Sequence, residues 1–473
     1  MLIAPIVRCI VRAKPAILLL AICGPAFAQG SAQSISAGDT AWLLSSAALV
    51  MLMLVPGLAL FYGGLVSQRN VLSTLMHSFF LLCLISVQWV LFGYSLSFGA
   101  DHGGLIGGLD YLLFRGVGQD AAAVAPTVPH MAFAMYQAMF AAITVALITG
   151  AFAERMKFAA FALFSLLWAT IVYDPLAHWV WGGGWLMKMG ALDFAGGTVV
   201  HISSGVSALV AAIVIGKRVG YPQKMLPPHN LSLTVMGASL LWFGWFGFNA
   251  GSALGATGLA ASAFAVTNTA AAMAGLTWVA IEYLHRGKPT VLGIVTGAVA
   301  GLVAITPASG YVGVPAAIAI GIGASCVCYL GVNTVKARFG YDDSLDVFGV
   351  HGLGGTWGAI ATGIFASKAV NPAGADGLLN GNPRQLVPQL AGVLAAWVVA
   401  GAGSFVILKV VSLVTNLRVA EEDELNGLDL AMHGEMAYNF LAPGMSTASS
   451  HHMSNESYFH PAPAAAELNS EMK

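Results

Sequence analysis

The chain has 473 residues, of which 58% are hydrophobic and only 9% are charged, and its formal net charge is −1. Soluble globular domains carry roughly 25% charged residues, so this composition is typical of a membrane protein with many spans. A near-neutral charge without clustered basic residues argues against a nucleic-acid partner.

The N-terminal 28 residues have the form of a cleaved signal peptide. Three basic residues precede a short apolar stretch, residues 16–23, and the small-residue pattern Ala26-Phe-Ala28 stands before Gln29. Eight apolar residues are too few for a membrane-spanning helix, which needs about 20. We therefore expect residues 1–28 to be removed and the mature N-terminus to lie outside the cytoplasm.

Apolar segments long enough to cross a bilayer recur along residues 29–417. They predict an all-α membrane protein with eleven transmembrane helices, near residues 41–66, 72–98, 130–153, 158–179, 194–216, 231–249, 258–284, 290–307, 311–336, 345–366 and 387–417. With the N-terminus outside, most loop arginines and lysines face the cytoplasm, and the outer loops carry only Arg115, Lys188, Lys368 and Arg384. This distribution follows the positive-inside rule and places the C-terminus in the cytoplasm.

In two separate apolar segments an acidic residue precedes a histidine by eight positions. Asp193 and His201 are the only ionisable residues between positions 191 and 215, and Asp343 and His351 have the same spacing. Ionisable groups within a bilayer cost roughly 2.5–3.5 kcal/mol each, so those that are kept usually line a pathway. At 1.5 Å per residue, His201 would lie about 12 Å beyond Asp193, near the bilayer midplane. We interpret Asp193 as a helix N-cap first and as an electrostatic group second.

The two copies of this spacing indicate an internal repeat, with five spans in residues 41–216, five in residues 231–366, and a last span at residues 387–417. An odd number of spans inverts the second copy, so His201 and His351 would converge at the midplane, where inverted-repeat transporters place the substrate. The alternative for each histidine is a hydrogen bond that only packs helices. Asp174 and Asp343 are interpreted mainly as caps or turns.

Residues 418–473 are predicted to form a cytoplasmic tail. It begins with the acidic run at residues 421–424 and ends in a stretch rich in Ser, Ala, Pro and His, a composition that favours disorder. Its histidines could bind metal adventitiously.

Six motifs in order make the chain resemble bacterial Amt proteins of the ammonium transporter family (Amt/Mep/Rh) over nearly all of residues 41–440. They are Pro56-Gly-Leu-Ala-Leu-Phe-Tyr-Gly-Gly64, His178-Trp-Val-Trp-Gly-Gly-Gly184, Asp193-Phe-Ala-Gly-Gly-Thr-Val-Val-His-Ile202, Gly244-Trp-Phe-Gly-Phe-Asn-Ala-Gly-Ser252, Asp346-Val-Phe-Gly-Val-His-Gly352 and Gly427-Leu-Asp-Leu-Ala-Met-His-Gly-Glu435. The resemblance implies a homotrimer in the lipid of the bacterial inner membrane, with one pore in each eleven-span subunit. It implies ammonium or ammonia as the substrate, and no enzymatic activity, cofactor or metal.

The resemblance also assigns an outer ammonium-recruiting site to Trp181 and Ser252. Tyr136 or Phe140 would complete an aromatic cage, and Asp193 would bias the vestibule toward cations. Aromatic faces stabilise a cation by roughly 0.5–2 kcal/mol, and a serine hydroxyl can accept an ammonium N–H. These residues are therefore the predicted substrate-binding set.

Further along the path, the resemblance assigns Phe140 and Phe248 to a stacked gate and His201, His351 and Trp245 to the pore. Neutral imidazoles can accept or relay a proton, but they compensate little for the desolvation of a potassium ion. The resulting hypothesis is that ammonium is deprotonated and that ammonia, with or without the proton, passes the two histidines.

The tail motifs Gly427-Leu-Asp429 and His433-Gly-Glu435 resemble the family segment that packs under the pores and meets a PII-type signalling protein. Three alternatives remain at this point. One is an Rh-like conduit for ammonia or carbon dioxide, which the intact Trp181 and Ser252 argue against, and another is an ammonium sensor with vestigial transport. The third is an intramembrane metallohydrolase that uses the two histidines, although a His-Glu-x-x-His pattern and a third ligand are missing.

Overall fold

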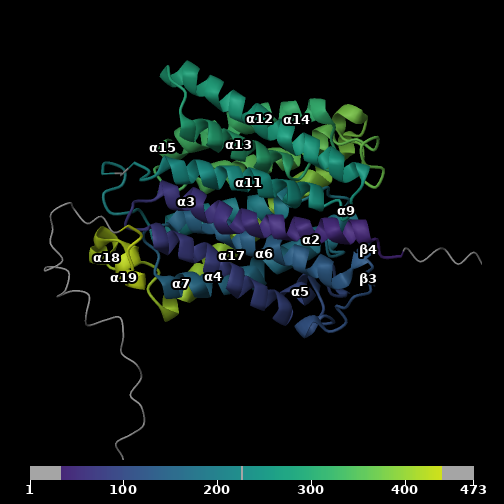
Figure 1. Ribbon diagram of the computed structural model, residues 1–473, viewed down its shortest axis with the longest axis horizontal. Coiled ribbons are helices and arrows are strands. Elements are labelled where there is room, and N and C mark those ends of the chain that lie inside the picture. The colour runs from purple at the N-terminus through teal and green to yellow at the C-terminus, as the bar shows by residue number, and fades with distance from the viewer. Residues whose placement is uncertain (1–33, 225–226, 439–473) are drawn as a thin grey trace, which may run out of the picture.

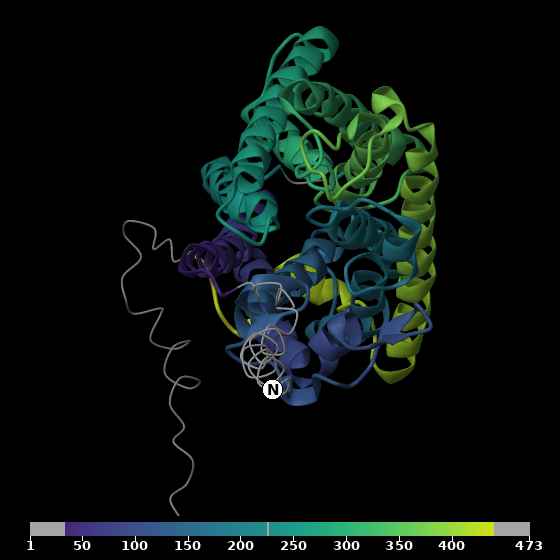
Figure 2. The same cartoon turned by 90° about the vertical axis from the view of Figure 1, so that its right-hand side faces the viewer.

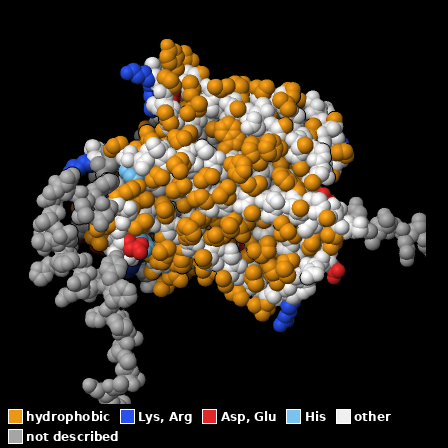
Figure 3. All heavy atoms as spheres, viewed as in Figure 1, with side chains coloured by type: hydrophobic (Ala, Val, Ile, Leu, Met, Phe, Trp, Pro, Cys, Tyr) orange, Lys and Arg blue, Asp and Glu red, His pale blue; other side chains and the backbone are white. Residues whose placement is uncertain are grey.

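The computed structural model describes residues 34–224 and 227–438, and the predicted signal peptide lies outside these residues. Within them, nine helices are long and apolar enough to cross a membrane. Most helices lie side by side along the horizontal direction of Figure 1. Hydrophobic side chains cover most of the face in Figure 3, and charged side chains lie near its edges, as expected for a surface in contact with lipid.

The first group of helices is formed by residues 37–215. It comprises α2 (Ala37–Leu52), η1 (Met53–Leu58), α3 (Ala59–Leu65), α4 (Val71–Gln88), η2 (Trp89–Gly93), α5 (Tyr94–Phe98), α6 (His130–Phe152), α7 (Phe158–Trp168), η4 (Ala169–Tyr173), α8 (Asp174–Val180), α9 (Trp185–Met189), η5 (Gly197–Ile202) and α10 (Ser203–Ile215). Short hairpins between α5 and α6 contain β1 (Asp101–His102), β2 (Ile106–Gly107), η3 (Leu112–Phe114), β3 (Ala121–Ala122) and β4 (Ala125–Pro129).

The second group is formed by residues 231–365. It comprises α11 (Leu231–Gly251), α12 (Gly258–Arg286), α13 (Val291–Ile305), α14 (Val314–Leu330), η6 (Gly331–Val335), α15 (Lys336–Phe339), η7 (Phe348–Gly352) and α16 (Leu353–Phe365). The chain continues through η8 (Leu378–Asn380) and η9 (Pro383–Gln385) into the long helix α17 (Leu386–Val414), and ends in α18 (Glu421–Asn426) and α19 (Leu428–His433). In Figure 2, α17 runs along the side of the molecule and covers both groups, in agreement with its contacts to α7, α10 and α16.

Each of the eleven predicted segments is helical, with boundaries within a few residues, and the fourth is followed after a short turn by the separate helix α9. Two segments are not among the nine long apolar helices: α13, which has 15 residues, and the segment formed by η7 and α16. The short length of α13 has a local cause. Thr290 caps its first turn by accepting the N–H of Gly293 at 2.8 Å, and Pro307 follows its last residue closely.

Several predicted continuous helices contain π-helical segments: η1, η2, η4, η5, η6 and η7. The interpretation of Asp174 as a cap or turn is wrong, because this residue lies inside a continuous path of helix between η4 and α8. Pro175 falls in the first turn of α8, and the preceding change from π to α geometry accommodates the backbone N–H that proline lacks. The Asp-Pro pair therefore does not end the span.

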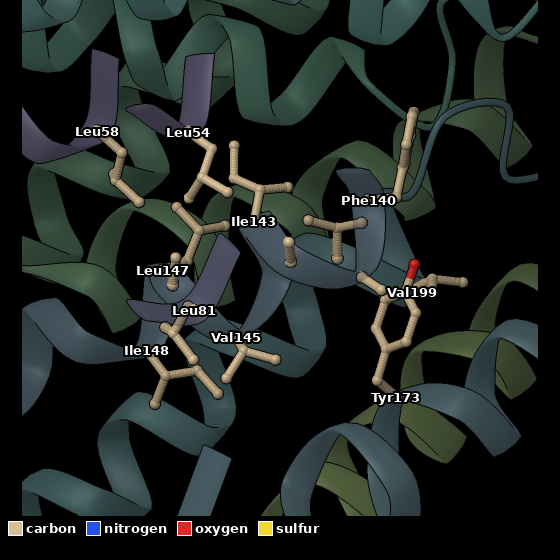
Figure 4. Close-up of a cluster of buried hydrophobic side chains, with 14 of the residues drawn as sticks. Leu54, Leu58, Leu81, Phe140, Ile143, Val145, Leu147, Ile148, Tyr173 and Val199 are labelled. Carbon is tan, nitrogen blue, oxygen red and sulfur yellow. The ribbon is translucent and has the colours of Figure 1, made fainter. Parts of the chain in front are cut away.

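Helix α6 is the centre of the packing in the first group. Almost all of its side chains are buried, which is typical of a helix surrounded by others. In Figure 4, Leu54 and Leu58 from η1 lie on one side of Ile143 and Leu147, and Leu81 from α4 approaches from another. Helix α6 cannot shift without disturbing all these contacts. It is therefore a rigid support for the side chains that it carries.

The described part of the tail packs against loops between helices. The backbone N–H of Lys157 donates to Leu417 O at 2.9 Å, and that of Val419 donates to Arg155 O at 3.1 Å. Asp429 accepts the N–H groups of Leu72 (3.0 Å) and Ser73 (2.8 Å) and so caps the start of α4. We call this part of the molecule the tail end: the loops at residues 66–70, 153–157 and 216–219, the loop at 340–347, and the tail residues 417–429.

Candidate functional site

The two histidines singled out by their spacing meet inside the molecule. His201 in η5 and His351 in η7 face each other with Nδ1 atoms 3.2 Å apart and ring centroids 5.2 Å apart. The side chain of His201 is fully buried, and that of His351 is 4% exposed. A direct Nδ1 to Nδ1 hydrogen bond needs one ring that donates and one that accepts, so the two neutral rings share one proton in this contact.

Asp193 and Asp343 hold the starts of the two segments that carry these histidines. Asp193 Oδ1 accepts from the N–H groups of Gly196 (2.8 Å) and Gly197 (2.7 Å), and Oδ2 accepts from Thr198 (2.8 Å) and Val199 (3.2 Å). The predicted capping role is therefore confirmed. Burial raises the pKa of the Asp193 carboxyl, and the four N–H donors offset part of that effect.

The second acid has the same kind of role. Asp343 Oδ2 accepts the N–H of Phe348 at 2.7 Å, at the start of η7. Burial raises its pKa to about 6. Its function as a cap agrees with the interpretation from the sequence.

An aromatic column leads away from the histidine pair. The rings of Phe140 and Phe248 are stacked with centroids 4.1 Å apart and an interplanar angle of 13°. His201 lies 6.1 Å from the ring of Phe248 and is stacked on Trp245 at 5.4 Å. We call Phe140, Phe248, His201, His351 and Trp245 the aromatic column. It contains no carboxylate and no permanently charged group.

Beyond Phe140, at the end of the column, the side chains of Trp181, Tyr136 and Ser252 form a cluster with Phe140. The ring of Trp181 lies 6.1 Å from that of Phe140, nearly perpendicular to it, and Tyr136 lies 4.9 Å from Phe140. Ser252 Oγ donates to Phe248 O at 2.8 Å and lies 3.2 Å from the Tyr136 hydroxyl. Because its single hydrogen is used on a carbonyl, the Ser252 oxygen keeps a lone pair for an incoming N–H donor.

The aromatic column separates two cavities. The first has a volume of about 1130 Å³, including its opening to solvent, and is lined by Phe140, Trp181, Asp193, Ser252 and Gln137, among others. The second has a volume of about 780 Å³, measured in the same way, and reaches His351, with Tyr62, Asp346, Thr296 and Arg218 in its wall. Phe248, His201 and Trp245 lie between them and are at most 1% exposed. A solute that moves from one cavity to the other must therefore pass the stacked phenylalanines and the two imidazoles.

All nine residues that we selected from the sequence lie in or beside this path, but the structure adds partners that sequence reasoning missed. The Tyr136 hydroxyl lies 2.9–3.0 Å from the carbonyls of Gly247 and Phe248, so its polarity serves to tie α6 to α11. Trp245 Nε1 donates to Thr306 Oγ1 at 2.9 Å. Only the tertiary packing reveals these contacts, since the partners are far apart in the sequence.

Gln137 is a further residue that the sequence reasoning did not select. It lines the first cavity, and its Oε1 atom is buried without a hydrogen-bond partner among the described residues. An amide oxygen in that state is available to an N–H donor. The sequence signal for this residue is its place directly after Tyr136, as a glutamine in a mostly apolar helix.

A metal site is not formed by the described residues. Among residues 34–224 and 227–438, no three His, Cys, Asp or Glu side chains lie close enough together to hold a metal ion.

The chain is similar to known proteins over most of its length. The model of the Ammonium Transporter Family matches residues 41–438. An ammonium transporter of Bacillus subtilis is 56% identical over 401 residues, which cover 85% of this chain and 98% of that protein. Ammonium transporter Amt1 of Archaeoglobus fulgidus is 51% identical over 405 residues, which cover 85% and 100%. The crystal structure of Candida albicans Mep2 superposes with a TM-score of 0.78 at 37% identity and covers 85% of this chain and 91% of that one.

Proposed function

The chain belongs to the ammonium transporter family, whose members are membrane proteins and not enzymes, and we propose that it carries ammonium across the bacterial plasma membrane. The observation that carries this proposal is the uncharged, buried aromatic column between two cavities. In such a path a bare cation would lose its hydration without a compensating charge, whereas ammonia would not.

The first step is recruitment in the outer cavity. Ammonium lies against the aromatic faces of Trp181, Phe140 and Tyr136, each able to stabilise a cation by roughly 0.5–2 kcal/mol. Ser252 Oγ accepts one of its N–H groups, which is supported by the orientation of that hydroxyl toward Phe248 O. The Asp193 carboxylate lines the same cavity and favours positive charge there, although its oxygens remain engaged as a helix cap.

The second step is passage of the gate. Phe140 and Phe248 are stacked at 4.1 Å, so one ring must rotate before a solute can pass. Beyond the gate no side chain of the column compensates a positive charge, and the favoured species is ammonia. Ammonium therefore gives up a proton near the gate, and the histidine pair takes part in its transfer.

The third step is passage of the two histidines. The ring of His201 has an unpartnered, buried Nε2 atom that can hydrogen-bond ammonia, and its Nδ1 contacts His351. A proton that enters on one ring can leave from the other with an exchange of tautomers, so the pair can relay a proton without a lasting charge. Whether the proton then follows ammonia across the membrane decides between net ammonium and net ammonia transport.

We infer that each subunit has eleven spans, with residues 41–216 and 231–366 as inverted repeats and residues 387–417 as the last span. The matching acid caps of η5 and η7 and the contact between His201 and His351 support this arrangement. Residues 1–28 are the signal peptide, the mature N-terminus is outside, and the tail end is cytoplasmic. The protein assembles as a homotrimer with a pore in each subunit.

The tail, residues 418–473, is proposed to regulate transport and to meet a PII-type protein. Support comes from its described part, which is bonded to three loops at the tail end, close to the cavity that contains His351 and Arg218. A change in tail position would be transmitted to the wall of that cavity through Arg218 and its partners. The Ser/Ala/Pro/His-rich end, residues 439–473, lies outside the described residues.

Transport is tested with purified protein in proteoliposomes on a solid-supported membrane, with ammonium and potassium pulses compared. We expect a current or pH change with ammonium and none with potassium. Trp181→Leu should raise the apparent KM for ammonium, while Trp185→Leu, at a tryptophan that lines another groove and not this cavity, should not. Equal responses to both cations, or no response to ammonium, would contradict the proposal.

A further inference from the structure

A buried polar pair lies in the first group of helices, away from the aromatic column. Gln88 is the last residue of α4 before η2, and Asp174 is the first residue of α8 after η4. Gln88 is 2% exposed and Asp174 is 0% exposed, and both lie inside long apolar helices that can cross the membrane. Gln88 Nε2 donates to Asp174 Oδ2 at 2.7 Å. The two side chains thus join two spans at their π-helical segments.

Asp174 has no cationic partner among the described residues. The ion pairs found there do not include it. His178, one turn further along α8, directs both ring nitrogens at other acceptors, Nε2 at Asp101 (2.9 Å) and Nδ1 at the carbonyl of Ser97 (3.0 Å), so any positive charge on its ring is paired with Asp101. A buried carboxylate without its own cation or several strong donors is costly, and such groups take up a proton instead.

Two unpartnered atoms of the pair indicate where that proton is. Asp174 Oδ1 and Gln88 Oε1 are both buried and make no hydrogen bond to a described residue. The Ser97 hydroxyl lies beside the carboxyl group, but its geometry is short of a regular hydrogen bond. As long as Asp174 is ionised, both unpartnered oxygens can only accept. One proton on Oδ1 turns it into a donor to Oε1, and the acid and the amide then share two parallel hydrogen bonds.

We propose that Asp174 is a neutral carboxylic acid in a doubly hydrogen-bonded pair with the Gln88 amide, and that this pair positions α8 and with it Trp181. The positioning part rests on the proposed function, because it concerns Trp181 as an outer-site residue. The protonation of Asp174 does not rest on the proposed function.

The link to Trp181 is short and rigid. Helix α8 has seven residues, and Trp181 is its C-terminal cap, two turns or about 10 Å from Asp174. Its far end is held by Trp179 Nε1, which donates to Leu105 O at 2.7 Å, and by Trp181 Nε1, which donates to Asp193 O at 2.8 Å. The pair with Gln88 is the side-chain hydrogen bond at its near end. Because Pro175 and the π-helical segment η4 weaken the backbone ladder there, this contact sets where α8 begins.

The protonation state is tested by infrared spectroscopy of the protein in lipid at neutral pH. The difference spectrum between the wild type and Asp174→Asn should contain a carboxylic acid C=O band, while the control Asp120→Asn, at an exposed position, should remove only carboxylate bands. A carboxylate band in the Asp174→Asn difference would overturn the neutral acid. This measurement does not depend on transport, so it distinguishes failure of this inference from failure of the proposed function.

The positioning role is tested by ammonium currents in proteoliposomes. Asp174→Asn can keep two hydrogen bonds with Gln88 and should leave the apparent KM within about twofold of the wild type. Asp174→Leu and Gln88→Met should each raise the apparent KM about threefold to tenfold, with a smaller change in maximal current. The double variant should have a KM no higher than either single variant.

Gln88→Met, close to glutamine in shape, is the variant to use if Asp174→Leu does not yield folded protein. An unchanged KM in folded Gln88→Met, with only a lower melting temperature, would overturn the positioning role, and an Asn variant as impaired as Leu would overturn the neutral pair.

Discussion

The aromatic column and the tail end use ionisable groups in opposite ways. In the column, the buried rings of His201 and His351 contact each other, and His201 lies against the rings of Trp245 and Phe248. At the tail end, Arg218 is bonded to Glu154 at 2.6 Å and to Asp342 at 2.8 Å. These three charges at the tail end are therefore paired with opposite charges, while the side chains of the column carry no fixed charge.

The difference also appears in the titration of the tail-end groups. Burial alone would raise the pKa values of Glu154 and Asp342, but the charge and hydrogen bonds of Arg218 outweigh it and hold both below their usual range. Arg155, fully buried beside them, has its pKa lowered to about 10 by burial and stays charged at neutral pH. It donates to the carbonyls of Gly216 and Asp342 and to the Ser344 hydroxyl.

The comparison shows what each region can do. Fixed charges in pairs hold loops and tail in one arrangement, because breaking a buried pair leaves an uncompensated charge. Uncharged groups that can gain and lose a proton allow a solute to pass without a deep binding site. The variants below add a fixed charge to the column, or remove a cation, a helix cap or the tail.

The largest effect is expected when the column receives a fixed charge. In His201→Asp or His351→Glu, a carboxylate would lower the cost of a bare cation in the column by several kcal/mol. Measurable potassium current should then appear beside ammonium current in the same proteoliposomes. The control His201→Ala should lower ammonium flux without passing potassium. Variants that keep the full ammonium flux and still exclude potassium would show that the histidines only pack the helices.

The next largest effect is expected when the tail end loses its central cation. Arg218→Met leaves Glu154 and Asp342 buried without the cation that pairs with both and should lower the free energy of unfolding by about 3–5 kcal/mol at neutral pH. The stabilisation depends on ionised carboxylates whose pKa values are lowered by folding. It should be constant above the usual carboxyl pKa of about 4 and disappear as the pH falls through the lower folded values.

The melting temperatures of the wild type and the variant, compared between pH 8 and pH 3, measure this stabilisation. Lys217→Met, at a neighbouring position, is the control, and a constant difference down to pH 3 would contradict the assignment.

A smaller effect is expected at the junction between the outer cavity and the column. Asp193→Ala leaves up to four N–H groups at the start of η5 unpaired and should cost about 1–3 kcal/mol, with loss of uptake. Asp193→Asn retains an oxygen acceptor and should lose much less. Thermal unfolding and ammonium uptake of both variants are the measurements. If the two variants behave alike, capping is not the main role of Asp193.

The smallest effect is expected from release of the tail. Deletion of residues after Leu425 removes the Asp429 cap on α4 and should change the transport rate without unfolding the spans. Asp429→Ala alone removes a cap worth about 1 kcal/mol and should reproduce part of the change. Glu421→Ala, at an exposed position in the same segment, is the control. Wild-type rates together with unchanged inhibition by a PII-type partner would refute a regulatory tail.

The features that could be read from the sequence are those with a local physical cause. The helical segments follow from runs of about 20 apolar residues, and their ends agree within a few residues. The Asp193 cap follows from its place four residues before a helix of small and apolar residues. The pairing of His201 with His351 was suggested by the repeated spacing, since an inverted repeat brings equivalent positions together.

Other features could not be predicted because they depend on partners distant in the sequence. Asp174 stands before a proline and looks like a turn, but Gln88, 86 positions earlier, meets it inside the membrane-spanning helices. The acidic residue Glu424 looks like part of a solvated run, but it accepts the N–H of Val219 and pairs with Arg418. In each case the local sequence is compatible with either an exposed or a buried acid. The residue that contacts the carboxyl group in the folded chain decides which of the two occurs.

The sequence by itself determined that this is an all-helical membrane protein, where its helices run, and which two histidines lie within its apolar segments, because lipid leaves few solutions for a long apolar segment. It did not determine which helices contain π-helical segments, where the stacked rings meet, or which carboxyl groups are paired with arginine and which with an amide. Those outcomes depend on contacts of a few ångströms between residues far apart in the chain. Only the tertiary structure decides them, because the free energy of a buried polar group is set by the partner that it finds.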